Sequence, residues 1–176
     1  RAPGTNCDAE TRYAFQLAGA RANVLHLNRW LESPLLIREV QILCIPGGFS
    51  YGDDIAAGRI FAHQLRYRLG DEIRRFRDEG GLVLGICNGF QVLLKSGLLD
   101  EHAADRPVAT LAWNQSGRYV DRWVRLGVEG DRCVFLKGVE TITLPIAHAE
   151  GNLQTVDQNA FDRLERGGRF PLRYRP

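Results

Sequence analysis

The stretch Leu82–Leu94, Leu-Val-Leu-Gly-Ile-Cys-Asn-Gly-Phe-Gln-Val-Leu-Leu, joins a short apolar run to a segment with helical spacing. The apolar run predicts a buried strand, and the spacing after it predicts that the strand turns directly into a helix. Cys87 occupies the turn, with Gly85 and Gly89 on either side. A reactive residue at a sharp strand-to-helix turn is a nucleophile elbow, where small neighbours leave room for a strained backbone.

The predicted elbow has a chemical consequence for Cys87. It lifts the sulfur out at the carboxyl end of the strand and directs the amino terminus of the following helix towards it. The positive end of the helix dipole favours thiolate over thiol, and the thiolate is the attacking form. Cys87 is therefore the candidate catalytic nucleophile.

Strands and helices alternate on both sides of this stretch through the first half of the chain. Val40–Ile45 is a continuous apolar run that predicts a strand ending at Pro46-Gly47-Gly48, and Gly58–Asp78 has helical periodicity. Asn23–Leu27 predicts a short strand, Glu10–Ala20 a helix with Asn6 or Asp8 near its cap, and Leu35–Glu39 a helical turn. Apolar strands separated by helices predict an open, mostly parallel sheet with helices on both faces.

The second half has a different pattern. Arg118–Val128 alternates with a period of two, Arg132–Leu136 and Glu140–Ile146 predict further short strands, and Ala160–Arg166 predicts a final helix. These segments indicate a small antiparallel excursion with one face in water. The predicted fold class is thus α/β, with residues 1–176 forming a single domain.

Composition and cysteine spacing exclude several classes of protein. The 176 residues are 44% hydrophobic and 25% charged, with a formal net charge of +2, which does not indicate nucleic-acid binding. The four cysteines show no metal-binding spacing, and Cys44 and Cys133 lie in apolar runs typical of buried thiols. Without a signal peptide or a membrane-spanning run, the expected location is the cytoplasm.

A second informative segment is Pro46–Asp53, Pro-Gly-Gly-Phe-Ser-Tyr-Gly-Asp. It follows a buried strand, so it should emerge at the carboxyl edge of the sheet, where open α/β folds bind ligands. Its glycines allow backbone N–H groups to face outward. Together with the N–H of Asn88, this loop could stabilise the oxyanion of a tetrahedral intermediate at Cys87.

Four segments resemble one family in order along most of the chain: PGTNCD (Pro3–Asp8), PGGFSYGDD (Pro46–Asp54), GICNGFQ (Gly85–Gln91) and PIAHAEGN (Pro145–Asn152). The family is the glutaminase subunits of phosphoribosylformylglycinamidine synthase, which are class I glutamine amidotransferases with a flavodoxin-like fold. The resemblance implies that Cys87 attacks the side-chain amide of glutamine, forms a glutamyl thioester and releases ammonia.

The resemblance also implies roles for other residues and for partners. Gly48 and Asn88 would form the oxyanion hole. Gln91 and the loop residues Gly47, Phe49, Ser50 and Tyr51 would hold glutamine. Ammonia would pass to an ATP- and Mg-using synthetase subunit, accompanied by a small accessory subunit, that makes formylglycinamidine ribonucleotide in purine biosynthesis. This chain itself would need no cofactor and no metal, and would bind neither nucleic acid nor a membrane.

The general base is the open question at this site. A cysteine nucleophile needs a histidine base and a carboxylate that orients it. His148 and Glu150 offer such a pair, but the family places its catalytic histidine later, in a Pro-His-Pro-Glu-Arg segment that this sequence lacks. The resemblance favours a structural or interface role for His148 and Glu150, and places Asn114, Ser116 and Arg122 near the site or the partner interface.

The two ends of the chain lead to further expectations. Ala2–Asn6 looks like the loop after a first strand, so the chain is expected to lack that strand and the carboxyl-terminal segment with the base. One alternative is therefore a base-less amidotransferase fold that acts only as a binding module. Another is a cysteine hydrolase of the dienelactone type, against which the Pro46–Asp53 loop argues.

Overall fold

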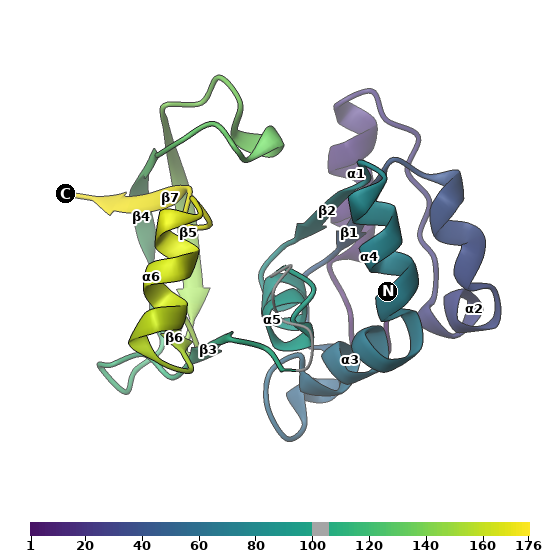
Figure 1. Ribbon diagram of the computed structural model, residues 1–176, viewed down its shortest axis with the longest axis horizontal. Coiled ribbons are helices and arrows are strands. Elements are labelled where there is room, and N and C mark those ends of the chain that lie inside the picture. The colour runs from purple at the N-terminus through teal and green to yellow at the C-terminus, as the bar shows by residue number, and fades with distance from the viewer. Residues whose placement is uncertain (100–105) are drawn as a thin grey trace. The chain divides into compact units, whose positions relative to one another are not determined.

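The computed structural model describes residues 1–99 and 106–176, which form an α/β fold (Figure 1). It divides into two compact units, Arg1–Thr110 and Leu111–Pro176. The expectation of a single domain over residues 1–176 stays a prediction.

The first unit contains most of the helices. Its elements are α1 (Asp8–Leu17), α2 (Leu27–Glu32), the 3-10 helix η1 (Pro34–Glu39), β1 (Ile42–Ile45), the 3-10 segment η2 (Ser50–Asp53), α3 (Arg59–Gln64), the π-helical η3 (Leu65–Leu69), α4 (Gly70–Asp78), β2 (Leu82–Gly85) and α5 (Asn88–Ser96), with β3 (Ala109–Ala112) at the boundary. The predicted helix over residues 58–78 is thus confirmed, with a π-helical turn in its middle.

The strands β1 and β2 form the parallel pair that positions the candidate site. Ile42 pairs with Leu82 and Ile45 pairs with Gly85. Because the strands run in the same direction, the loop after β1 and the turn after β2 leave the sheet at the same edge. The Pro46–Asp53 loop and Cys87 therefore lie together, as the sequence predicts.

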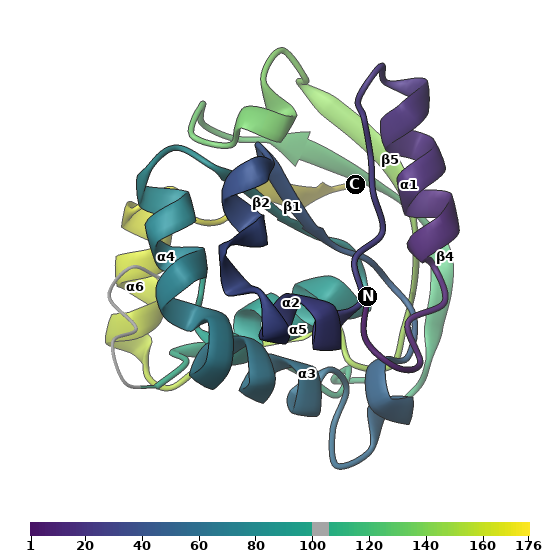
Figure 2. The same cartoon turned by 90° about the vertical axis from the view of Figure 1, so that its right-hand side faces the viewer.

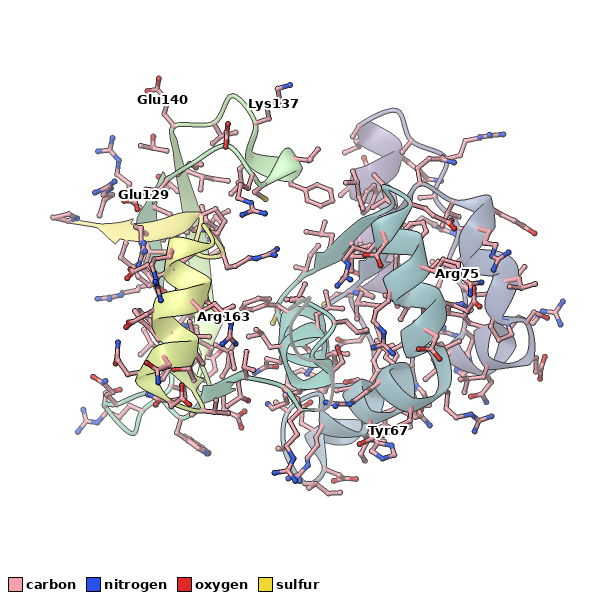
Figure 3. All side chains as sticks on the ribbon, in the orientation of Figure 1. Tyr67, Arg75, Glu129, Lys137, Glu140 and Arg163 are labelled. Atoms are coloured by element: carbon pink, nitrogen blue, oxygen red, sulfur yellow. The ribbon has the colours of Figure 1, made fainter. Side chains whose placement is uncertain are left out.

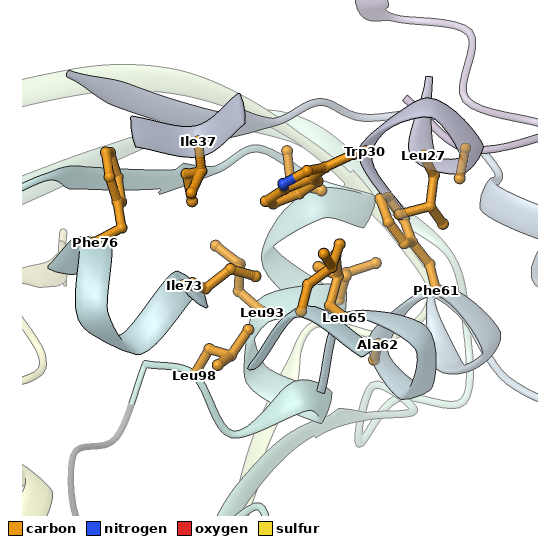
Figure 4. Close-up of a cluster of buried hydrophobic side chains, with 14 residues drawn as sticks. Leu27, Trp30, Ile37, Phe61, Ala62, Leu65, Ile73, Phe76, Leu93 and Leu98 are labelled. Atoms are coloured by element: carbon orange, nitrogen blue, oxygen red, sulfur yellow. The ribbon is translucent and has the colours of Figure 1, made fainter. Parts of the chain in front are cut away.

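Apolar side chains from several helices form the core of the first unit (Figure 4). Leu65, Ile73 and Leu93 are almost fully buried, as are Val92 and Leu69. Figure 2 shows α3 leading towards α4 on one side of this unit. Burying these side chains holds α5, and hence Cys87 at its amino end, against the rest of the unit.

The predicted strand Asn23–Leu27 is wrong, because residues 20–26 form no strand and Leu27 begins α2. Among the described residues, only Arg1 pairs with this segment: its amino group donates to the Leu25 carbonyl at 2.5 Å, and its carbonyl accepts from the Leu27 N–H at 2.8 Å. His26 then caps α2 by accepting a hydrogen bond from the Asn28 N–H. A single pairing residue is too short a partner to define a strand.

The second unit is dominated by an antiparallel sheet. Its elements are β4 (Val120–Val128), the 3-10 turn η4 (Val134–Leu136), β5 (Thr141–His148), β6 (Asn152–Thr155), α6 (Gln158–Arg166) and β7 (Leu172–Arg175). The strand order is β5-β4-β7, all antiparallel, and β3 pairs with β6. The predicted antiparallel excursion and final helix are confirmed.

The two faces of the β4 strand differ as its alternation predicts. Val124 and Leu126 are buried, whereas Trp123 is 71% exposed. Glu129, labelled in Figure 3, lies just beyond β4 and forms ion pairs with Arg173 and Arg175 of β7. The sheet therefore has one packed face and one face in water.

The predicted strand Arg132–Leu136 is wrong. Residues 134–136 instead form a 3-10 turn, in which the Leu136 N–H donates to the Cys133 carbonyl and the Val139 N–H to the Leu136 carbonyl. These local hydrogen bonds use the backbone groups that a strand would offer to a neighbour.

Within residues 1–99 and 106–176, no helix is both long and apolar enough to cross a membrane.

Candidate active site

Cys87 lies between the end of β2 and the start of α5 in a strained backbone conformation. Its φ is 53° and its ψ is −115°, a combination that side-chain-bearing residues rarely adopt. Such a conformation costs on the order of 1–3 kcal/mol and persists where the surrounding fold imposes it. Cys87 is also exposed. The predicted elbow is therefore confirmed in its geometry.

The two glycines beside Cys87 are required by close backbone packing. A Cβ added to Gly89 would lie 1.9 Å from the Ile45 carbonyl oxygen, and one added to Gly85 would lie 2.7 Å from the Gly89 oxygen. Both distances are far below van der Waals contact. This crowding keeps β1, β2 and α5 close enough together to form the elbow.

The Pro46–Asp53 loop is held by the amino-terminal segment of the chain. The Phe49 N–H donates to the Gly4 carbonyl at 3.1 Å, and the Tyr51 N–H donates to the Pro3 carbonyl at 2.7 Å. Gly48 has a φ of +126° and lies so close to Asn6 that an added Cβ would be 2.5 Å from its Oδ1. Gly48 therefore needs to be glycine for both conformational and steric reasons.

A buried hydrogen-bond network centred on Asn88 joins this loop to α5. The Asn88 Oδ1 accepts from the Ser50 hydroxyl at 2.6 Å and from the Ser50 N–H at 3.2 Å. Its Nδ2 donates to Asp53 Oδ1 at 2.9 Å and to Gln91 Oε1 at 3.2 Å. Asn88 is only 3% exposed, so its side chain fastens the loop to the residue after the nucleophile.

Sequence reasoning missed the structural roles of Asp53 and of the Asn88 side chain. Asp53 accepts both from Asn88 and, at 3.1 Å, from the Gly58 N–H. The signal was available, because a carboxylate beside an expected oxyanion site would be unfavourable unless donors surrounded it. In the sequence, Asn88 stood out only for its backbone N–H.

The loop residues predicted to contact glutamine differ in their exposure and in their hydrogen bonds. Phe49 is 62% exposed and Ser50 is buried. The Tyr51 hydroxyl donates to Gln64 Oε1 at 2.6 Å, while the Tyr51 ring packs against the core. The structure brings Gly47, Gly48, Asn88 and Gln91 into the same neighbourhood, and their contact with a substrate stays a prediction.

Cys7 is a second thiol near the nucleophile that sequence reasoning did not single out. A Cβ added to Gly47 would lie 3.3 Å from the Cys87 Cβ and 3.7 Å from the Cys7 sulfur, so both cysteines flank Gly47. Burial, with the nearby Glu10 and Cys87, raises the pKa of Cys7. The sequence feature that could have pointed to Cys7 is its position within the Pro3–Asp8 motif. Cys7 also occupies the cap position of α1, where Asn6 or Asp8 was expected.

The thiols expected to be buried are half-buried. Cys44 lies in β1 and Cys133 just before the 3-10 turn, and both keep partial exposure. The free edge of β1 explains Cys44, because strand pairing covers only the side facing β2. Burial raises the pKa of Cys44 to about 11, which keeps it a thiol near neutral pH.

The remaining predicted site residues lie in the second unit, where all of them except Glu150 line a pocket of about 340 Å³. His148 ends β5, and its Nδ1 lies 3.0 Å from Asn114 Oδ1. Ser116 and Arg122 also line the pocket, together with Tyr174 of β7. Glu150 is half-buried two residues beyond His148. Their assignment as base, orienter or interface residues stays a prediction.

Among residues 1–99 and 106–176, no group of histidine, cysteine, aspartate and glutamate side chains is arranged to hold a metal ion.

A family model described as a CobB/CobQ-like glutamine amidotransferase domain matches residues 1–176. The phosphoribosylformylglycinamidine synthase subunit PurQ of Dehalococcoides mccartyi is 49% identical to this chain over 154 residues, which are 87% of this chain and 60% of that protein. The subunit of the same name from Methanococcus maripaludis strain C7 is 37% identical over 173 residues, 97% of this chain and 63% of that protein.

A solved structure is also similar. A chain in the structure of PurLQS from Thermotoga maritima superposes with a TM-score of 0.71 at 32% sequence identity, covering 90% of this chain and 68% of that chain. This chain spans about three fifths of the length of the first two curated relatives, 60% and 63%.

Proposed function

Because this chain belongs to the CobB/CobQ-like glutamine amidotransferase family, we propose that it is a glutaminase whose nucleophile is Cys87. The thiolate attacks the side-chain amide carbon of glutamine, and the tetrahedral intermediate expels ammonia to leave a glutamyl thioester. Water then hydrolyses the thioester to glutamate and restores the thiol. The observation that carries the proposal is the strained, exposed Cys87 at the start of α5, facing a loop fixed by glycines.

The proposed oxyanion hole consists of the Gly48 and Asn88 N–H groups. The Asn88 N–H lies in the first turn of α5, where backbone donors have no partner within the helix. Such fixed donors stabilise developing negative charge without having to reorient. Gly47, Phe49, Ser50, Tyr51 and Gln91 are the proposed contacts to glutamine, with Ser50 and Tyr51 acting through the loop that they anchor.

The proposed destination of the ammonia is a synthetase partner. By the names of its relatives, this partner is the synthetase subunit of phosphoribosylformylglycinamidine synthase, which would use ATP and Mg to make formylglycinamidine ribonucleotide. A small accessory subunit belongs to the same proposal, and this chain contributes neither a cofactor nor a metal. Its four free cysteines fit the reducing cytoplasm, where we place the complex.

The experiment compares two nitrogen sources in the assembled complex. Cys87→Ala should abolish synthesis from glutamine while synthesis from free ammonia continues, because only the glutaminase step needs the thiolate. Cys44→Ala is the matched control, since that thiol lies in β1 and should leave both activities intact. Loss of both activities in the Cys87 variant would contradict the proposed division of labour.

The second candidate function is a binding module without its own base. It is favoured by the resemblance of the motif around His148 to a family segment distinct from the one that would supply the catalytic histidine. His148→Ala should lower glutamine-dependent synthesis only modestly in the complex. A loss as large as that of Cys87→Ala would instead assign His148 as the base.

We also propose that β1 and β2 belong to an open, mostly parallel sheet with helices on both faces, and that a further strand lies beside β1. The described edge of β1 away from β2 has no strand partner, and it lines a cavity of about 860 Å³. The hydrogen bonds of Arg1 to Leu25 and Leu27 follow the pattern of a parallel ladder. A strand leading into Arg1 would continue that ladder and fill the cavity.

A further inference from the structure

We infer that Asn114 is a positioning residue that fixes the tautomer of His148, so that Nε2 is the ring nitrogen that accepts a proton or a hydrogen bond. Asn114 follows β3, and His148 ends β5. Their side chains meet at 3.0 Å between Asn114 Oδ1 and His148 Nδ1. Which of these two atoms donates follows from the other contacts of the amide.

The Asn114 amide has only one orientation that satisfies its backbone neighbours. Its Nδ2 lies 2.8 Å from the Arg118 carbonyl and 2.9 Å from the His148 carbonyl, and both partners can only accept. Its Oδ1 lies 3.1 Å from the Gly151 N–H, which can only donate. If the amide were turned over, its NH₂ group would face the Gly151 N–H, so that two donors would meet. Its oxygen would then face the Arg118 and His148 carbonyls, so that acceptors would meet.

The orientation of the amide determines the proton position on the imidazole. Because Asn114 Oδ1 is an acceptor, His148 Nδ1 must carry a hydrogen and donate it. In the neutral ring, Nε2 then holds the lone pair. Among the residues that the structure describes, Nε2 has no hydrogen-bond partner.

Gly151 fixes the position of the ring from a second side. A Cβ added to Gly151 would lie 2.0 Å from His148 Cε1 and 2.2 Å from Nδ1, so the ring packs directly against the glycine backbone. A side chain here would displace the ring and break its hydrogen bond to Asn114. Two independent contacts thus hold the His148 imidazole in one position.

The pocket beside His148 indicates what the fixed ring would meet. It is lined by the polar residues Gln115, Ser116, Arg122 and Tyr174 of the same unit. A ligand group with an N–H or O–H would find its acceptor at Nε2, and an anionic group would find Arg122.

The tautomer can be measured without substrate, so this inference stands apart from the proposed glutaminase activity. The full chain is labelled with ¹⁵N-histidine, and the imidazole nitrogens are observed by NMR at a pH where the ring is neutral. The chain has four histidines, and His148→Gln assigns the relevant signals. We expect a single dominant tautomer of His148, with the proton on Nδ1.

Three variants separate positioning from folding. Asn114→Ala should convert His148 to a mixture of tautomers, because it removes the oxygen that accepts from Nδ1. Ser116→Ala is the matched control, since the hydrogen bonds of the Ser116 hydroxyl within the described residues go to the Arg118 backbone and not to His148. Gly151→Ala should also give a mixture of His148 tautomers, because the added methyl group would displace the ring from Asn114.

Two results would overturn the inference. One is a parent protein in which His148 carries its proton on Nε2, because Asn114 would then not determine the tautomer. The other is an Asn114→Ala protein that keeps the Nδ1-protonated form while the second unit stays folded. Unchanged backbone amide signals from the paired strands β4 and β7, which lie in the same unit as His148, report that the variants remain folded.

Discussion

An added methyl group at Gly89 has no space to occupy. Its Cβ would lie 1.9 Å from the Ile45 carbonyl oxygen and within 2.9 Å of the Pro46 oxygen, both of which are backbone atoms that cannot rotate away. Gly89→Ala should therefore push α5 away from β1 and lower the free energy of unfolding by about 3 kcal/mol. Urea unfolding followed by circular dichroism measures the loss.

Gly80→Ala is the control for this substitution. Gly80 lies in the same unit, with a φ of +94° and no atom within 4 Å of an added Cβ. Gly80→Ala should lower the free energy of unfolding by only about 1–2 kcal/mol, which is the cost of placing alanine in a left-handed conformation. Equal losses for the two variants would show that crowding at Gly89 is not the cause.

Cys44 makes stability depend on pH in the alkaline range. Burial raises its pKa in the folded protein to about 11, above the value of 9.0 expected for an unperturbed thiol. Between these two values the unfolded chain releases its proton first, so the unfolded state binds fewer protons and stability falls as pH rises. Urea midpoints from pH 8 to pH 11 should therefore decrease.

Cys44→Ala identifies the source of this dependence. The alanine variant should show a shallower decline over the same pH range, because the only group removed is the thiol of Cys44. Cys133→Ala is the matched control and should decline like the parent. An unchanged slope in the Cys44 variant would assign the effect to other groups.

At the scale of elements, the loop after β1 and the helix α5 behave as one piece because Asn88 joins them. Asn88→Ala would leave the buried Ser50 hydroxyl and Ser50 N–H without their acceptor, while Asp53 would keep its hydrogen bond from the Gly58 N–H. Each unsatisfied buried group costs about 1–3 kcal/mol. We expect hydrogen exchange at the Ser50 amide to accelerate roughly 10-fold or more.

Tyr51→Phe provides the comparison within the same loop. It removes one hydrogen bond, from the Tyr51 hydroxyl to Gln64, and leaves the Asn88 network intact. Exchange at the Ser50 amide should change much less than in Asn88→Ala. If both variants exposed the Ser50 amide equally, the loop would open as a whole, and Asn88 would not be its specific anchor.

At the scale of the whole molecule, the open edge of β1 borders a cavity of about 860 Å³. An extended apolar segment joined to Arg1 would pair with β1 and cover apolar side chains that line the cavity. Such an extension should raise the thermal midpoint by several degrees.

The control extension has the same length and composition, with a proline at its centre. Proline removes a backbone donor and is not tolerated within a central strand. The apolar extension should raise the midpoint and the proline version should not. Equal effects of both would mean that the cavity accepts apolar chain without strand pairing.

Local patterns in the sequence determined the elbow and the loop that faces it. The apolar run before Cys87, the glycines beside it and the helical spacing after it all describe neighbouring residues, so they predict local structure reliably. The same holds for the helix over residues 58–78 and for the alternation of β4. The strands β3, β6 and β7 escaped prediction because short strands depend on distant partners. The strand expected at residues 23–27 failed because its only described partner is Arg1.

The tertiary structure alone decided how polar side chains are shared between elements. Asn88 holds Ser50 and Asp53, and Cys7 flanks the nucleophile. Asn114 determines the proton position on His148. The paired residues are at least 34 positions from each other in the sequence, except for Asn114 and Arg118. A hydrogen bond is directional and depends on distances of a few tenths of an ångström. Sequence periodicity carries no such information, whereas the packed backbone fixes it.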